Sequence, residues 1–300
     1  MTRKDRWMSP VWGRREFLAL LAAAAFAGAT RAQSTPRIAA IDWAMMETAV
    51  ALGVMPVAAT ELIQFRAGAV EPEIPETVAD LGLRGAPNFE LLQLTRPDLI
   101  LISPFYTRYT GRLEAIAPVF SLPFYVKGEP PFAKALAAVT ALGGKLGRAE
   151  QAHRVLDETE AALHALRTRL AGFAARPTYV INIGDARHFR AFGADSMFGD
   201  VLGRLGLANA WVDRSQFTFA APVPIENLAA SPDARIVVVS DIPVEARETL
   251  RNSAIWRALP AVRENRVLTL ANVAPYGGIT AGMRFARLLT EALSVRGEAL

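Results

Sequence analysis

The residues of this chain that could do chemistry are polar and aromatic side chains placed near the ends of predicted strands. Ligands of α/β proteins bind at the carboxyl ends of such strands. Taken singly, each of these residues is more often a surface or packing residue, but their joint placement indicates a ligand-binding cleft. The side chains concerned are Arg84, Tyr106, Phe217, Thr218, Phe219 and Tyr276.

Sequence motifs that would indicate catalysis are absent. The chain has no Gly-x-Ser-x-Gly elbow, no HExxH pair, no Walker loop and no dinucleotide fingerprint. Its three histidines, His153, His164 and His188, do not cluster, so solvated surface positions suit them better than a metal site. We therefore predict a binding protein, not an enzyme, with no metal or cofactor held by its own side chains.

The N-terminal segment has the layout of an export signal. Arg14 and Arg15 are paired, Phe17 and Leu18 follow at the twin-arginine spacing, and an apolar run continues to Ala29. This run is shorter than the ~20 residues that cross a bilayer. We predict a twin-arginine signal peptide over residues 1–32, cleaved near Ala32, and export to the periplasm. A general secretory signal or an ordinary N-terminal helix remains the alternative.

Removing that segment changes the charge balance. Residues 1–32 hold six of the 33 basic and two of the 29 acidic residues, which leaves 27 of each in the mature chain. The net charge of the mature chain is therefore zero, and it gives no support for binding to nucleic acid or to a membrane surface. Cysteine is absent, which excludes disulfides, thiolate metal sites and a lipoprotein anchor.

Short apolar strands alternate with helical patterns along the mature chain, which predicts an α/β fold with parallel strands. The predicted strands are 37–41, 54–58, 99–102, 179–182, 235–239 and 266–270, and the predicted helices include 45–52, 88–96 and 279–294.

One long helix divides this pattern. Between Arg148 and Phe173, apolar residues recur at steps of three and four and charged residues fill the other face. We predict a connector helix over residues 148–173, an N-terminal α/β lobe over 33–147 and a C-terminal α/β lobe over 174–300. The alternative is a helix packed on the sheet of a single domain.

An internal repeat supports two similar lobes. In the first half, a short predicted helix with Glu90 in its first turn ends at Pro97-Asp98 and leads into the strand 99–102. In the second half, a short helix opened by Glu226 ends at Pro232-Asp233 and leads into the strand 235–239. A glutamate in the first turn of a helix is favoured by the helix dipole, so local stabilisation is one explanation of both glutamates.

The mature chain resembles the periplasmic ferric-hydroxamate (ferrichrome-type) siderophore-binding proteins of ABC importers, within the wider Fe³⁺-siderophore and cobalamin binding-protein group. The resemblance covers essentially all of the mature chain and rests on the order and spacing of several short motifs. These are residues 37–43, 51–54, 80–84, 87–90, 96–98, 116–118, 185–188, 192–193, 196–198, 209–211, 256–259 and 276–277.

This resemblance implies two α/β lobes with parallel-rich central sheets, joined by a single long rigid helix and closing only slightly on a shallow cleft. The arginine and tyrosine that bind hydroxamate oxygens in the family fall on Arg84 and Tyr106, and a second-lobe tyrosine falls on Tyr276. A guanidinium offers a fixed fork of donors to such oxygens. Iron stays inside the siderophore, so the protein needs no metal ligands.

The chain also departs from the family. Three positions at which the ferrichrome-type binder presents tryptophans align with Gly68, Thr218 and Ala274. Trp43, Phe217 and Phe219 could partly replace that aromatic surface. The departures predict a related chelate of different shape.

The resemblance further implies a partner, an inner-membrane ABC permease with its cytoplasmic ATPase, for a monomeric binding protein. Acidic residues on the rim of each lobe would dock to arginines of the permease. Glu90 and Glu226 fit this role, and Glu114 is the fallback in the first lobe. Alternative functions are binding of cobalamin or haem and, from another class, a twin-arginine-exported enzyme.

Overall fold

The first sheet of the fold contains five parallel strands in the order β3–β2–β1–β4–β5. The computed structural model describes residues 35–212 and 222–297. The predicted signal peptide and the predicted site residues Phe217, Thr218 and Phe219 lie outside these described ranges. The strands are β1 (Ile38–Ala40), β2 (Ala58–Ala59), β3 (Ala79–Asp80), β4 (Leu99–Ile102) and β5 (Val119–Ser121).

The three central strands of this sheet, β1, β2 and β4, are apolar throughout because both of their faces are covered. In β4, Leu99 and Leu101 face one buried cluster, whereas Ile100 and Ile102 face another. A parallel sheet covered on both sides has this continuous apolar sequence. The elements between the strands are α2 (Trp43–Ala51), α3 (Leu62–Gly68), α4 (Phe89–Leu94), η1 (Pro104–Tyr109) and α5 (Thr110–Glu114).

The second sheet has the order β10–β9–β6–β7–β8 and is mixed. β10, β9 and β6 are parallel, but β6 pairs antiparallel with β7, and β7 pairs antiparallel with β8. The sheets are therefore rich in parallel strands, as predicted, and the antiparallel pairs are confined to β7 and β8. The strands are β6 (Thr178–Ile183), β7 (His188–Ala191), β8 (Val223–Pro224), β9 (Arg235–Val239) and β10 (Val267–Leu270).

The antiparallel edge has a local cause, the turn between β6 and β7. Asp185 Oδ1 accepts the backbone N–H groups of Arg187 (2.7 Å) and His188 (2.9 Å), which closes a tight reversal. One face of the second sheet is covered by η3 (Ile225–Ala230), α9 (Val244–Asn252), α10 (Ala254–Ala258) and α11 (Pro260–Arg263).

Helices from both halves of the chain form a layer whose core is shared by the two sheets. One buried cluster contains Leu101 of β4, Val237 of β9 and Phe285 of α12. The described residues from Pro36 onward form one compact unit, within which both sheets lie. The helices of the layer are α2, α6 (Phe132–Lys145), α7 (Ala149–Leu170), α8 (Met197–Arg204) and α12 (Ile279–Gly297).

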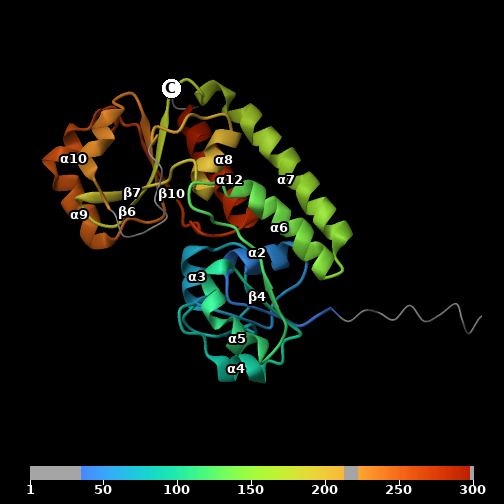
Figure 1. Cartoon of the computed structure of the whole chain (residues 1–300). Helices are drawn as coiled ribbons and strands as arrows, with labels where there is room; N and C mark the ends of the chain where they lie inside the picture. Colours follow the sequence, from blue (N-terminus) through green and yellow to red (C-terminus); the bar gives the residue numbers. More distant parts are fainter. Residues whose placement is uncertain (1–34, 213–221, 298–300) are drawn as a thin grey trace, which may run out of the picture. The chain divides into compact units, whose positions relative to one another are not determined.

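The connection between the sheets runs through α6 and α7, which lie side by side (Figure 1). The α-helical part of the predicted 148–173 helix ends at Leu170, and residues 171–173 continue as the 3-10 helix η2. The predicted apolar face of α7 is buried, and it includes Ala152, Val155 and Leu170. None of the helices in the described part has both the length and the apolarity needed to cross a lipid bilayer.

The strand predicted at 54–58 is largely wrong. The strand β2 comprises Ala58 and Ala59, which pair with β1, and Val57 N–H donates to Ile38 O of β1 (2.8 Å). Pro56 has no N–H to donate, so the preceding residues cannot continue a ladder inside the sheet.

A buried carboxyl group ties the first half of the chain to the second. Glu47 on α2 is fully buried, and its Oε2 accepts the N–H groups of Gly278 (2.7 Å) and Ala281 (3.2 Å) at the start of α12. A Cβ on Gly277 would lie 2.4 Å from Glu47 Oε1, so only glycine fits there. Burial raises the pKa of the Glu47 carboxyl to about 8.

This raised pKa makes stability depend on pH. Between pH about 4.5 and 8, the folded protein keeps a proton on Glu47 that the unfolded chain has released, so the free energy of unfolding falls as pH rises. In Glu47→Gln the group is neutral at every pH. We expect the stability of Glu47→Gln relative to wild type to rise between pH 5 and 8, by at most about 1.4 kcal/mol per pH unit.

Urea unfolding at several pH values measures this difference, with the exposed Glu160→Gln on α7 as control. A difference between Glu47→Gln and wild type that stays constant from pH 5 to 8 would show that Glu47 is ionised in the folded protein.

Candidate functional site

The carboxyl ends of β1 and β4 are joined by Asp42. Its Oδ1 accepts the N–H of Met45 (3.1 Å) and so caps α2, while its Oδ2 accepts the hydroxyl of Ser103 (2.8 Å), which follows β4. Burial raises the pKa of the Asp42 carboxyl, against the opposing effects of Ser103 and Arg84. Trp43 and Tyr106 extend from the segments that Asp42 holds together.

Arg84 is fixed on two sides. Its Nε donates to Glu61 Oε2 (2.6 Å), its backbone N–H donates to Glu61 Oε1 (3.0 Å), and its guanidinium lies 4.1 Å from the centre of a Trp43 ring. Trp43 is itself held by a hydrogen bond from Nε1 to Thr60 O (2.9 Å). Glu61 therefore uses the Nε edge of the guanidinium and Trp43 covers one face, so the Nη side faces Tyr106 and is the side that can meet a ligand.

Glu61 reaches this position through an unusual backbone. Its φ is +52°, in the left-handed region that residues with a Cβ rarely adopt, and its N–H donates to Gly82 O (2.8 Å). Such strain costs on the order of 1–3 kcal/mol and persists where the surroundings enforce it. Sequence reasoning missed Glu61 because a single glutamate 23 residues before Arg84 forms no recognisable motif.

Tyr106 belongs to η1, is half-buried and lies beside Arg84. Burial and the negative charge of Asp42 raise the pKa of Tyr106 to about 12, and a hydrogen bond with Arg84 acts in the opposite direction. The phenol is therefore neutral at physiological pH and can donate its O–H. The structure thus brings Trp43, Arg84 and Tyr106 together near the carboxyl ends of their strands.

Tyr276 follows β10 and is placed by contacts with the first half of the chain. Its ring meets that of Tyr125 edge-on at 5.5 Å, and the Tyr125 hydroxyl donates to Gly277 O (2.5 Å). Burial raises the pKa of Tyr276 to about 12. Burial, with the negative charges of Glu47 and Asp42, also raises the pKa of Tyr125.

Tyr125 therefore contacts Tyr276 and is close enough to Asp42 to feel its charge, and sequence reasoning missed it. Tyr125 comes four residues after β5, so the same rule that located Tyr106 would have found it. The rule was not applied because β5 was not predicted.

The three aligned tryptophan positions differ in their surroundings. Gly68 ends α3 with open space where a Cβ would lie. Ala274 is 2% exposed and belongs to the buried core, so a tryptophan there would displace core side chains. Thr218 lies outside the described residues.

The predicted docking glutamates are all exposed. Asn88, not Glu90, caps α4 by accepting the N–H of Leu91 (2.9 Å), and Glu90 lies in the first turn. Glu226 occupies the first turn of η3, a 3-10 helix, and Glu114 is the last residue of α5. The backbone N–H of Asn88 donates to Leu81 O, just after β3, and that of Ile225 donates to Arg187 O, in the turn after β6. Glu90 and Glu226 therefore both lie near the carboxyl ends of strands.

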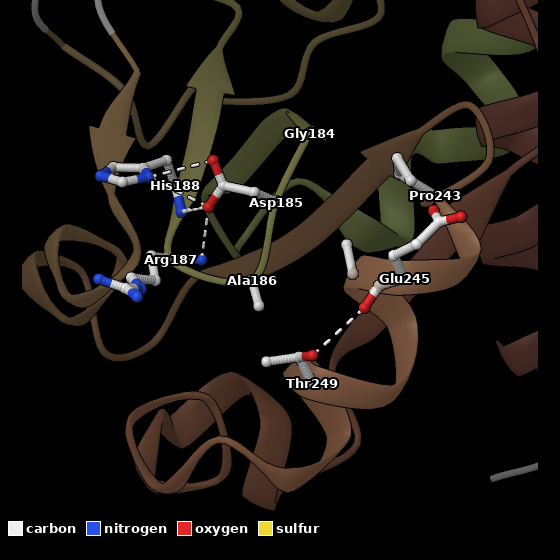
Figure 2. A pocket seen from close by; sticks show the side chains of 9 residues that line it. Gly184, Asp185, Ala186, Arg187, His188, Pro243, Glu245 and Thr249 are labelled. Carbon is white, nitrogen blue, oxygen red and sulfur yellow. Dashed lines mark hydrogen bonds and ion pairs between the residues drawn. The ribbon is translucent and has the colours of Figure 1, made fainter.

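A further hollow of about 490 Å³ lies at the carboxyl end of β6, between the β6–β7 turn and α9 (Figure 2). His188 Nδ1 lies 3.0 Å from Asp185 Oδ1, where Asp185 belongs to the turn and His188 is the first residue of β7. Figure 2 shows this pair opposite Glu245 and Thr249 of α9. Within residues 35–212 and 222–297, no three His, Asp or Glu side chains are grouped so that they could hold a metal ion.

Comparison with protein families gives one match over most of the chain. Residues 38–274 match the family model described as periplasmic binding protein. Among individual proteins, the chain is similar to the iron(3+)-hydroxamate-binding protein FhuD of Escherichia coli (strain K12). The two are 31% identical over 257 residues, which cover 86% of each chain.

Solved structures show the same architecture. FhuD from Vibrio cholerae, solved with bound Fe³⁺–Desferal, has a TM-score of 0.80 and 25% identity, covering 87% of this chain and 98% of that one. The petrobactin-binding protein YclQ from Bacillus subtilis has a TM-score of 0.70 and 17% identity, covering 86% and 92%, and supports the fold alone.

Proposed function

The chain belongs to the periplasmic binding protein family, and from that premise we propose that it captures a ferric siderophore of the hydroxamate class and delivers it to an inner-membrane ABC permease. The observation that carries this proposal is the fixed guanidinium of Arg84, whose Nη groups stand beside the neutral phenol of Tyr106. Similarity to two proteins named as hydroxamate or Desferal binders supports the ligand class.

The chemistry of the cleft suits a hydroxamate chelate. Hydroxamate oxygens bound to Fe³⁺ keep partial negative charge and accept hydrogen bonds from guanidinium and phenol groups. Trp43 and Tyr276 add aromatic surface for the hydrocarbon of the ligand. Iron enters as cargo wrapped by the siderophore, so binding is proposed without a metal ligand from the protein and without catalysis.

The proposed partner is a permease with a cytoplasmic ATPase, and the proposed state of the binding protein is monomeric. Glu90 and Glu226 support docking because each lies near the carboxyl edge of its sheet, on the side from which the cleft residues extend. Exposed charges of this kind act mainly on orientation and association rate.

The first prediction tests the ligand and its class. Arg84→Ala should weaken ferric-hydroxamate binding by roughly 2–4 kcal/mol, since the partners of a buried charged hydrogen bond are left unsatisfied. Glu61→Gln should weaken it less, because the guanidinium remains but loses its fixed partner. Quenching of intrinsic fluorescence measures both affinities, with Arg154→Ala on α7 as the control.

The same titration compares ferric hydroxamates with ferric catecholates, haem and cobalamin. Tightest binding of hydroxamates, reduced by Arg84→Ala, supports the proposal. Tighter binding of cobalamin or haem, or unchanged affinity in Arg84→Ala, would reject the hydroxamate assignment.

Docking predicts a change in transport without a change in binding. The double variant Glu90→Ala with Glu226→Ala should bind the siderophore normally but deliver it several-fold more slowly to permease-containing vesicles, most strongly at low salt. Glu160→Ala on α7 is the matched exposed control. Normal uptake by the double variant would leave both glutamates with a local role at helix starts.

Export by the twin-arginine route is proposed from Arg14, Arg15 and the short apolar run after them. Replacing both arginines with lysine should trap the uncleaved precursor in the cytoplasm, because the receptor reads the arginine pair. Fractionation of cells with an antibody to the mature chain measures this. Periplasmic, cleaved protein from the lysine variant would indicate the general secretory route.

A further inference from the structure

The amino ends of β6, β9 and β10 lie side by side in the second sheet. They are at the opposite end of the strands from Tyr276, which follows the carboxyl end of β10. A hollow of about 760 Å³ opens there. Three arginines line it, Arg176, Arg235 and Arg266, and we call it the arginine hollow. Its remaining walls include Phe173, Leu268 and Leu293.

Arg235 is the unusual member of this group. It is the first residue of β9 and only 6% exposed. Its Nη2 donates to the backbone carbonyls of Arg176 (3.0 Å) and Phe173, but its Nε is buried without a hydrogen-bond partner. It makes no ion pair with a carboxylate in the part of the chain that the structure describes.

The neighbouring charges increase this imbalance. Desolvation by burial, together with the like charge of Arg176, lowers the pKa of Arg235 to about 10. The one carboxylate lining the hollow is Glu264, whose side chain is 62% exposed and pairs with Arg266 Nε (3.0 Å). Three positive charges therefore face one exposed negative charge.

The hydrogen bonds of Arg235 to backbone carbonyls do not explain why a whole charged guanidinium is buried here. The carbonyls of Arg176 and Phe173 need only the Nη2 group of Arg235, and a buried charge costs several kcal/mol unless an opposite charge compensates it. Folded proteins therefore place buried charges next to a counter-charge. Within residues 35–212 and 222–297, no carboxylate supplies this counter-charge to Arg235.

We propose that the arginine hollow is an anion site that binds a phosphate group, with Arg235 and Arg176 as its principal donors. Guanidinium groups match the oxygens of a phosphate with two parallel N–H donors. The hollow is larger than a phosphate ion and has apolar walls, so an organic substituent on the phosphate can be accommodated. The phosphate can be free in solution or part of a lipid headgroup.

Thermal unfolding of the mature protein tests the site. Potassium phosphate, compared with KCl at equal ionic strength, should raise the Tm by roughly 2–5 °C once phosphate exceeds its Kd tenfold. Arg235→Met should abolish this rise. Without phosphate, Arg235→Met loses the hydrogen bonds to the carbonyls of Arg176 and Phe173 but also the uncompensated buried charge, so its Tm should stay close to that of wild type.

Arg251→Met, an exposed arginine of α9, is the matched control and should keep the full response to phosphate. Arg176→Met removes an exposed charge of the hollow, so it folds whatever the effect of Arg235→Met and should reduce the response several-fold. Sedimentation with phosphatidylglycerol vesicles, compared with phosphatidylcholine vesicles, separates a lipid phosphate from a free one.

A phosphate response in wild type that Arg235→Met abolishes and Arg176→Met reduces confirms the site, and vesicle binding then assigns the source. No phosphate response in wild type, or an equal response in Arg235→Met and Arg176→Met, would overturn it. Siderophore affinity is read separately, so failure here leaves the proposed function standing.

Discussion

Glu47 occupies the point at which the two halves of the chain meet, and much of the site depends on it. Its carboxyl accepts the first N–H groups of α12, a helix that begins 232 residues later in the chain, and it packs against a glycine that cannot be replaced. The turn before α12 carries Tyr276. The place of a second-lobe tyrosine is thus set by a first-lobe helix, and residues from both sheets belong to one buried core.

Charge in the cleft is balanced by a few specific contacts. Glu61 neutralises Arg84 directly, and burial raises the pKa of both Asp42 and Glu47, which favours their protonated forms. A guanidinium in these surroundings offers directed hydrogen bonds without a large positive potential. Three hydroxamates neutralise Fe³⁺, so their chelate needs donors more than it needs counter-charge. A ferric catecholate carries excess negative charge and would be attracted less by such a site.

Sequence patterns predicted the elements whose signal is local. β4 and β9 are continuous apolar runs covered on both faces, and α7 shows its buried stripe in the spacing of Ala152, Val155 and Leu166. The region 54–58 was misassigned because composition outweighed the effect of Pro56 on strand pairing. Asp185 is a residue typical of tight turns, and a turn at this position indicates that β7 runs antiparallel to β6.

Contacts between distant residues were not predictable in the same way. Arg84 and Tyr106 were placed by strand ends and by resemblance to a family, but their partner Glu61 depends on a left-handed backbone position that no spacing reveals. Tyr125 follows β5, a strand of three residues of which two are half-buried and one is exposed, so its sequence gives a weak strand signal.

The direction of the strands determines where these sites lie. The carboxyl ends of the strands are followed by Trp43, Tyr106 and Tyr276, and the candidate docking glutamates lie near such ends. The arginine hollow lies at the amino ends of β6, β9 and β10. The arginine hollow and Tyr276 lie at opposite ends of the strands of the second sheet, so the proposed anion and the proposed chelate have different donors.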